Sequence, residues 1–231
     1  MVKAPLASPS LEIQSQVMSQ ICAQQLPEDS WAKVHLWLHD LIGGCESHLG
    51  SESCVTFIDC NPSFSIYTEL AMLAASRLIV PCTSDSSSAR AIDNLAALVY
   101  GYRSSYASVG FSQSCKKFNL KPPLIQAVVL NRTTQYQKSA SKAFGAMFEE
   151  IRDRVMTFGN AQPESFVDRQ VTFLEIPDNH TSTVASAYFG KPMSQMTAGS
   201  YEIRGKKVQL NAAQLERYRT AFSKLRKSLG L

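Results

Sequence analysis

The sequence lacks several features that would assign it to a particular class of protein. No apolar run comes near the ~18 residues that a membrane-spanning helix requires. The six cysteines form no CxxC pair, so their spacing indicates neither a zinc site nor a disulfide framework. The N-terminus carries Lys3 and then a mixed Pro/Ser/Ala stretch, without the apolar core of a signal peptide. We therefore expect a cytoplasmic protein with no membrane partner.

A glycine-rich loop ending in Lys-Ser or Lys-Thr, the usual cradle for nucleotide phosphates, is also missing. The single Gly-Gly pair, Gly43-Gly44, falls in a predicted helix and has no Lys-Thr after it. Yet the apolar run 54–59 ends in Asp59 and is followed by a turn of small and rigid residues. Such a run is typical of a buried parallel strand whose carboxylate organises the water around Mg²⁺. The sequence reads as one half of a nucleotide site.

The rest of the sequence predicts an α/β protein. At 231 residues, 45% hydrophobic and 18% charged, it has the composition of a globular domain with a sizeable core. Strand-like runs at 54–59, 77–82, 124–130 and 171–176 alternate with helical patterns at 66–75, 87–106, 137–158 and 180–190. Alternation of this kind gives a mostly parallel, doubly wound sheet with helices on both faces. Helices are also expected at 10–25, at about 28–49 with a core-facing apolar stripe, and from Asn211 to the end.

Two histidines four residues apart, His35 and His39, lie on one predicted helix and could in principle bind a metal. No HExxH glutamate or further ligand lies nearby, so a packing or surface role is the preferred interpretation. Cys54, Cys60 and Cys82 lie on or beside the predicted buried strands, where a free cysteine acts as a small hydrophobe.

The positive charge is concentrated at the C-terminus. The net charge is +4, but residues 201–231 alone carry +6, so the other 200 residues sum to −2. The basic residues of this segment are Arg204, Lys206, Lys207, Arg217, Arg219, Lys224, Arg226 and Lys227. A solvated helix face is the plain interpretation, and an anionic partner such as non-specific DNA is the functional one.

Five short motifs occur in a fixed order between about residues 50 and 195. They are an apolar strand end with Asp and Pro-Ser (57–63), a helix with LAxxAA spacing (68–81), a Ser-rich helix start (84–88), a strand ending in Asn131, and an IP…GKP segment (176–193). In this register they resemble the ParA/MinD branch of the deviant-Walker P-loop ATPases, and ParA-type partition proteins most closely. No single motif is strong, but five in order are fairly specific.

The resemblance implies a P-loop NTPase-like α/β fold and a set of site residues. Asp59 corresponds to the family's catalytic and Mg²⁺-site carboxylate. Asn131 and Arg132 correspond to the adenine-contacting strand end, and Pro177 and Asp178 to the loop that lines the adenine pocket. The implied cofactors are ATP and Mg²⁺. The plain alternatives are a turn residue for Asp59, a turn residue that caps the next helix for Asn131, and helix caps for the serines at 86–88.

The sequence departs from the family at its N-terminus. Family members open with a KGGxGKT-like Walker A loop, and this chain has about 58 residues before Asp59 where they have on the order of a hundred. It resembles a single ParA-like domain that lacks its first one or two βα units, through truncation, an internal start or degeneration. Its parts are a helical N-terminal segment (1–50), an α/β core (51–195) and a basic C-terminal segment (196–231). The gap left in the sheet must then be covered by the N-terminal segment or by another copy in a homodimer.

The function implied by the resemblance is partition or positioning of plasmid or chromosomal DNA, with ATP binding, DNA binding and a ParB-like partner. Without the Walker A loop we expect impaired catalysis. A non-catalytic DNA-binding or interaction protein on the same fold is the alternative, and a relative of the amide-forming synthetases is a third, which the basic C-terminus disfavours.

Overall fold

The computed structural model describes residues 27–50, 54–60, 63–103, 110–133, 135–136, 139–140 and 142–231. The chain divides into two compact units, unit 1 (Met1–Ala75 with Ser108–Pro122) and unit 2 (Ser76–Ala107 with Pro123–Leu231). The helix predicted at 10–25 lies outside the described residues. Among the described helices, none combines the length and the apolar character needed to cross a bilayer.

Unit 1 is helical. It contains α2 (Ser30–His35), α3 (Trp37–Leu49), α4 (Ile66–Ala74) and α6 (Phe111–Lys117). The predicted helix at about 28–49 is present as α2 and α3, and Gly50 ends it in a left-handed conformation with φ 60°. The expected core-facing stripe is wrong for α3, because none of its residues is buried and Leu49 is 63% exposed. The buried side chains come instead from His35 of α2, from α4, and from Phe111 and Cys115 of α6.

The predicted strand at 54–59 is not formed. Residues 54–60 have no regular secondary structure, Phe57 is 69% exposed, and Asp59 is exposed as well. A strand needs a neighbour to hydrogen-bond it, and no strand described in the structure pairs with this segment. The apolar character of the run predicts burial, but it does not indicate whether a neighbouring strand is present. Cys54 and Cys60 are therefore exposed thiols, whereas Cys82 is buried as expected.

Unit 2 is built on a three-stranded parallel sheet. Its strands β1 (Arg77–Cys82), β2 (Leu124–Thr133) and β5 (Phe173–Pro177) lie in the order β1-β2-β5. Three of the four predicted strands and their parallel direction are confirmed. The register of β1 on β2 moves from Leu78↔Ile125 to Ile79↔Ala127, so Gln126 is an extra residue in β2. Its Nε2 donates to the Ser228 carbonyl oxygen at 2.7 Å and fixes the end of the last helix.

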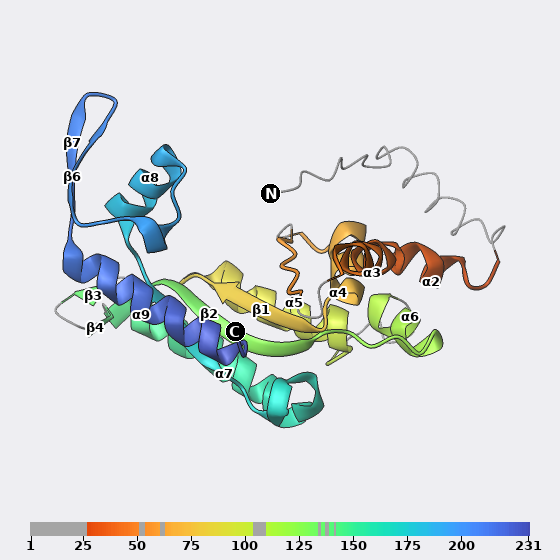
Figure 1. Ribbon diagram of the computed structural model, residues 1–231. Coiled ribbons are helices and arrows are strands. Elements are labelled where there is room, and N and C mark those ends of the chain that lie inside the picture. Colours follow the sequence, from red (N-terminus) through yellow and green to blue (C-terminus); the bar gives the residue numbers. More distant parts are fainter. Residues whose placement is uncertain are drawn as a thin grey trace. The chain divides into compact units, whose positions relative to one another are not determined.

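Helices cover both faces of this sheet, which confirms the α/β class. The helices α5 (Ser86–Tyr100) and α7 (Lys142–Ala161) pack on one face against Ile125, Val128 and Leu130 of β2. The last helix, α9 (Ala212–Ser228), packs on the other face against Ala127 and Val129 (Figure 1). The alternating apolar side chains of β2 thus reach two separate layers. A short antiparallel pair, β3 (Gln135–Tyr136) and β4 (Ser139–Ala140), follows β2.

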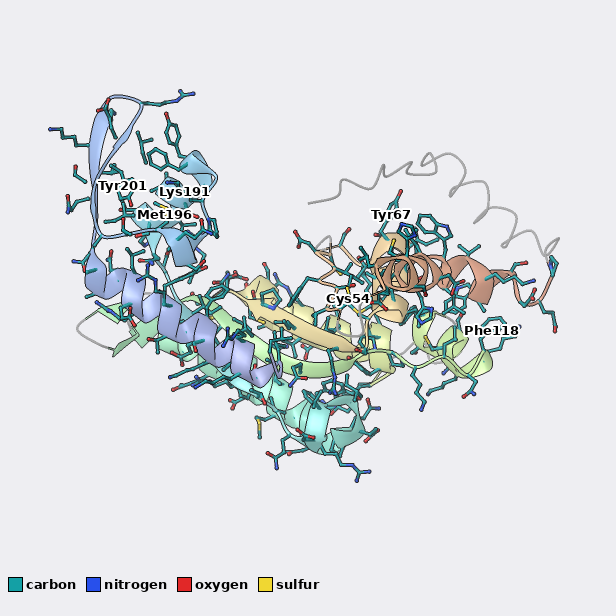
Figure 2. The ribbon with its side chains drawn as sticks, in the orientation of Figure 1. Cys54, Tyr67, Phe118, Lys191, Met196 and Tyr201 are labelled. Carbon is teal, nitrogen blue, oxygen red and sulfur yellow. The ribbon has the colours of Figure 1, made fainter. Side chains whose placement is uncertain are left out.

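The remainder of unit 2 contains a β-hairpin that the sequence analysis missed. Its strands β6 (Gly199–Ile203) and β7 (Lys206–Leu210) pair antiparallel. The elements between α7 and this hairpin are η1 (Pro163–Ser165), η2 (Val167–Arg169), β5, α8 (His180–Phe189) and η3 (Met193–Gln195). Arg204 (φ 49°) and Gly205 (φ 76°) form the two-residue turn, which has the positive φ angles of a type I′ turn. Figure 2 shows Tyr201 of β6 near Met196. Met196 is a buried member of a second apolar cluster, and Tyr201 packs against that cluster.

Candidate functional site

The carboxyl ends of β2 and β5 bring together the four residues predicted to bind a cofactor, which are Asn131, Arg132, Pro177 and Asp178. The strand register places Asn131 beside Ile176 and Pro177 beside Thr133. The register shifts between residues 131 and 133, and Arg132 occupies the irregularity with φ 57°. The Asp178 N–H then donates to the Thr133 carbonyl oxygen at 3.3 Å. The strand ends therefore form a single edge, as ligands of doubly wound sheets require.

Asp178 is the electrostatic centre of this edge. Its carboxylate is only 11% exposed, and its Oδ2 lies 3.6 Å from Arg132 Nε and 3.0 Å from His180 Nε2. The Arg132 side chain is 65% exposed, so much of its fork of N–H donors faces solvent. A nearly buried carboxylate thus holds an exposed guanidinium at the end of β2, in a position to donate to an anionic or carbonyl group of a ligand.

Asn131 is partly engaged by its own turn. Its Oδ1 accepts from the Arg132 N–H at 2.9 Å, which leaves the amide NH₂ as the part that can donate to a base edge. The interpretation of Asn131 as a cap for the next helix is wrong, because α7 begins only at Lys142.

Two buried polar atoms beside this edge have no partner among the described residues. They are Asn179 Oδ1 and Ser182 Oγ, in side chains that are 4% and 1% exposed. Asn179 precedes α8, and its Nδ2 donates to the Gln214 carbonyl oxygen at a long 3.5 Å. An unpaired buried polar atom costs roughly 1–3 kcal/mol, so these atoms point to a ligand or a water here. The sequence carried no signal for Ser182 beyond its place after a strand end.

Asp59 belongs to unit 1, and the β2–β5 edge belongs to unit 2. Asp59 is exposed on the irregular segment 54–60. In the described part of the chain no group of three or more His, Cys, Asp or Glu residues could hold a metal ion. Mg²⁺ is commonly held by one or two carboxylates together with substrate phosphates, so the role of Asp59 at such a site stays a prediction.

The N-terminus of α5, which follows β1, is capped by the side chain of Asp85. Asp85 is the N-cap, and its Oδ1 accepts from the Ser88 N–H at 2.8 Å while Oδ2 accepts from the Thr83 hydroxyl. The hydroxyl contact comes first among the causes that lower the pKa of Asp85. The N-cap is Asp85 and not one of the predicted serines at 86–88, which form the first turn of α5. Ser88 still helps to close this turn, because its Oγ accepts from the Thr83 N–H at 3.0 Å. A carboxylate of the chain thus already engages the Ser88 N–H at this helix N-terminus.

His35 and His39 have separate roles. His35 is fully buried, its Nδ1 donates to the Trp31 carbonyl oxygen at 2.8 Å, and its Nε2 lies 2.8 Å from Glu69 Oε2. His39 is exposed beside Asp40. His35 is thus a packing residue that ties α2 to α4, as the preferred interpretation held.

The basic residues of the C-terminal segment lie on two elements. Arg204, Lys206 and Lys207 belong to the hairpin, and the other five belong to α9. Seven of the eight are exposed; Arg219 is half-buried, and its guanidinium donates to the Met196 carbonyl oxygen at 2.6 Å. Arg219 therefore holds η3 onto α9, and its first role is structural.

One side of α9 carries three exposed cations. Arg217, Lys224 and Lys227 recur at spacings of seven and three, which places them on one face of a helix. The opposite side carries Leu215, Tyr218 and Leu225, which pack into unit 2. We call the three cations the α9 basic face.

No protein-family model matches the sequence, and no curated protein matches it. Among solved structures, apo McdA of Cyanthece is similar with a TM-score of 0.52 and 13% identity. The match covers 78% of this chain and 57% of that one, so the chain spans under two thirds of McdA. At this identity the likeness shows the fold alone, and the chain shares part of the α/β fold of McdA.

Proposed function

We propose that the chain is a ParA-like DNA partition or positioning protein that holds duplex DNA through its C-terminal basic surface and has an impaired nucleotide site. The observation that carries the proposal is the α9 basic face, a row of exposed cations on a helix whose other side is anchored to a sheet of ParA-like fold. A fixed row of cations displaces counterions from DNA without ordering a flexible tail first.

The nucleotide side of the proposal rests on the β2–β5 edge. Asn131 and Arg132 offer donors, and Asn179 Oδ1 and Ser182 Oγ offer buried groups that lack partners among the described residues. These donors and buried polar atoms suit the adenine base of ATP, because the edge of the base can form hydrogen bonds with them. The sequence offers no glycine-rich loop for phosphates, and α5 begins with its own carboxylate. We therefore expect ATP to bind weakly and hydrolysis to be negligible in this chain.

A homodimer and a ParB-like partner belong to the same proposal. The order β1-β2-β5 leaves β1 at an edge of the described sheet, with one row of its backbone groups facing away from β2. Native proteins seldom leave such an edge open, so a second copy is a suitable cover for it.

The alternative is a non-catalytic DNA-binding or interaction protein that kept the fold, and the lack in this sequence of a glycine-rich loop ending in Lys-Ser or Lys-Thr favours it over an active ATPase. The two are separated by nucleotide dependence. DNA affinity that rises with ATP supports the partition role, and affinity independent of ATP supports the alternative.

The proposal is tested by anisotropy titration of a labelled duplex with the full chain. The variant Arg217→Ala/Lys224→Ala/Lys227→Ala should bind more weakly to every duplex. A charge-matched control, Arg90→Ala/Lys116→Ala/Lys121→Ala, removes three exposed cations elsewhere and should bind like the parent. A parent that binds no duplex at low salt contradicts the proposal.

A further inference from the structure

The β6–β7 hairpin has two unlike faces. Tyr201, Ile203 and Val208 pack against the cluster that contains Met196 and Leu215, and this fixes one face of the ribbon to unit 2. The alternate residues form the other face, which is polar and exposed; they are Ser200, Glu202, Lys207 and Gln209. We call these four residues the outer face of the hairpin.

The tip of the hairpin is cationic. Arg204 and Gly205 form the turn and Lys206 follows it, and all three are exposed. Figure 1 shows that the loop end extends beyond α8. The hairpin carries three basic residues, Arg204, Lys206 and Lys207, and its one acidic residue is Glu202. The ribbon is thus a projecting and positively charged element.

These dimensions and side chains suit the major groove of B-DNA. A strand of five residues is about 17 Å long at roughly 3.4 Å per residue, and the groove, about 12 Å wide, admits a two-stranded ribbon. Lysine binds guanine O6 and N7, glutamine binds adenine N6 and N7, and serine can bind either. Lys207 and Gln209 of the outer face are residues of these types.

We propose that the β6–β7 hairpin enters the major groove of duplex DNA, with Arg204 and Lys206 on phosphates and with Lys207 and Gln209 on base edges. The inference rests on the proposed function, because the α9 basic face supplies the non-specific hold that brings the hairpin to the duplex. It adds a sequence preference, which phosphate contacts alone do not give. An anionic membrane suits the hairpin less well, because Arg204-Gly205-Lys206 presents no apolar side chain for insertion.

The test uses the full chain, labelled duplexes and two groove-blocking dyes. Methyl green, which occupies the major groove, should weaken binding by the parent, and netropsin, which occupies the minor groove, should not. Selection from a randomised duplex library should give the parent a preferred sequence. Lys207→Ala/Gln209→Ala should reduce that preference roughly tenfold for each base that is no longer read. Arg204→Ala/Lys206→Ala should weaken all duplexes about equally.

The outcomes separate this inference from the proposed function. If the parent binds duplex but methyl green has no effect, or if Lys207→Ala/Gln209→Ala keeps the same preference, groove reading is wrong and the proposed function stands. If the parent binds no duplex, both fail. If the hairpin variants lose binding only to phosphatidylserine vesicles, the hairpin is a membrane contact and the inference is overturned.

Discussion

Arg132, near the end of β2, and Asp178, directly after the neighbouring parallel strand β5, form an ion pair with Arg132 Nε 3.6 Å from Asp178 Oδ2. The sequence predicted both as cofactor-binding residues without indicating that they contact each other. Because Asp178 is nearly buried and also lies 3.0 Å from His180, it orients the exposed guanidinium at the end of β2. The candidate site is therefore a small charged network at one edge of the sheet.

The first prediction concerns the strength of this pair. In a double-mutant cycle of Arg132→Ala and Asp178→Ala, urea denaturation should give a coupling free energy of about 1 kcal/mol or less, because Arg132 is largely solvated. The exposed pair Lys33–Asp29, at 2.7 Å, is the control and should couple no more strongly than Arg132 and Asp178. A coupling of several kcal/mol would mean that the pair is a buried structural bridge.

Nucleotide binding should be weak. Backbone N–H groups and the lysine of a phosphate loop normally supply most phosphate contacts, so calorimetry with Mg-ATP should give a Kd of roughly 1 mM, about −4 kcal/mol. Asn131→Ala should weaken even this binding if the base lies at the β2–β5 edge. Micromolar affinity, or steady turnover that Asp59→Ala abolishes, would contradict the expectation.

Thiol reactivity should report the exposed segment 54–60. Burial raises the pKa of Cys82 and of Cys115 to about 11, so at pH 8 only about a thousandth of each is thiolate. Cys54 is exposed and should be alkylated quickly by iodoacetamide, as peptide mass spectrometry can measure. Cys60 is exposed too, but it should react more slowly, because partial desolvation of its sulfur and then the charge of Asp59 raise its pKa. If Cys54 reacts as slowly as Cys82, the segment 54–60 is not exposed, and the predicted buried strand at 54–59 is the better description.

The cap of α5 should make stability depend on pH. The Thr83 hydroxyl and then the Ser88 N–H lower the folded-state pKa of Asp85, so the cap stabilises the chain above the unfolded pKa of about 3.9. That stability is lost as pH falls through the lower folded pKa. Asp85→Ala should cost about 1 kcal/mol at pH 6, and the difference from the parent should shrink near pH 3.

Asp85→Asn is the control for the cap, because asparagine also caps helices and its side chain does not titrate. Its difference from Asp85→Ala should stay constant over the same pH range in urea denaturation. A parent whose advantage over Asp85→Ala is the same at pH 3 and pH 6 shows that ionised Asp85 is not the cap.

The fold could be predicted where local patterns and long-range pairing agree. The runs at 77–82 and 124–130 are strands because each finds a parallel neighbour, and Asn211 starts α9 because its Oδ1 accepts from the Ala213 N–H. The run at 54–59 is also largely apolar, but it finds no neighbour among the described strands. Local composition does not contain that difference.

The site was predictable only in part for a similar reason. Strand ends marked Asn131 and Asp178, because polar residues after apolar runs are visible in a sequence. The contact between Arg132 and Asp178 depends on a register irregularity in β2, and the unpaired atoms of Asn179 and Ser182 depend on burial. The hairpin was missed although Tyr201-x-Ile203 and Val208-x-Leu210 alternate around Arg204-Gly205, a pattern typical of a two-residue turn.

The salt dependence of duplex affinity tests the central claim, that the α9 basic face holds DNA through phosphates. Anisotropy titrations of the parent at several salt concentrations should show log K falling linearly with log salt. For Arg217→Ala/Lys224→Ala/Lys227→Ala the slope should be shallower by about 2.7, because each phosphate that a cation neutralises adds ~0.9 to it. The control Arg90→Ala/Lys116→Ala/Lys121→Ala should keep the parent slope. Equal slopes for the parent and the α9 variant would contradict the account.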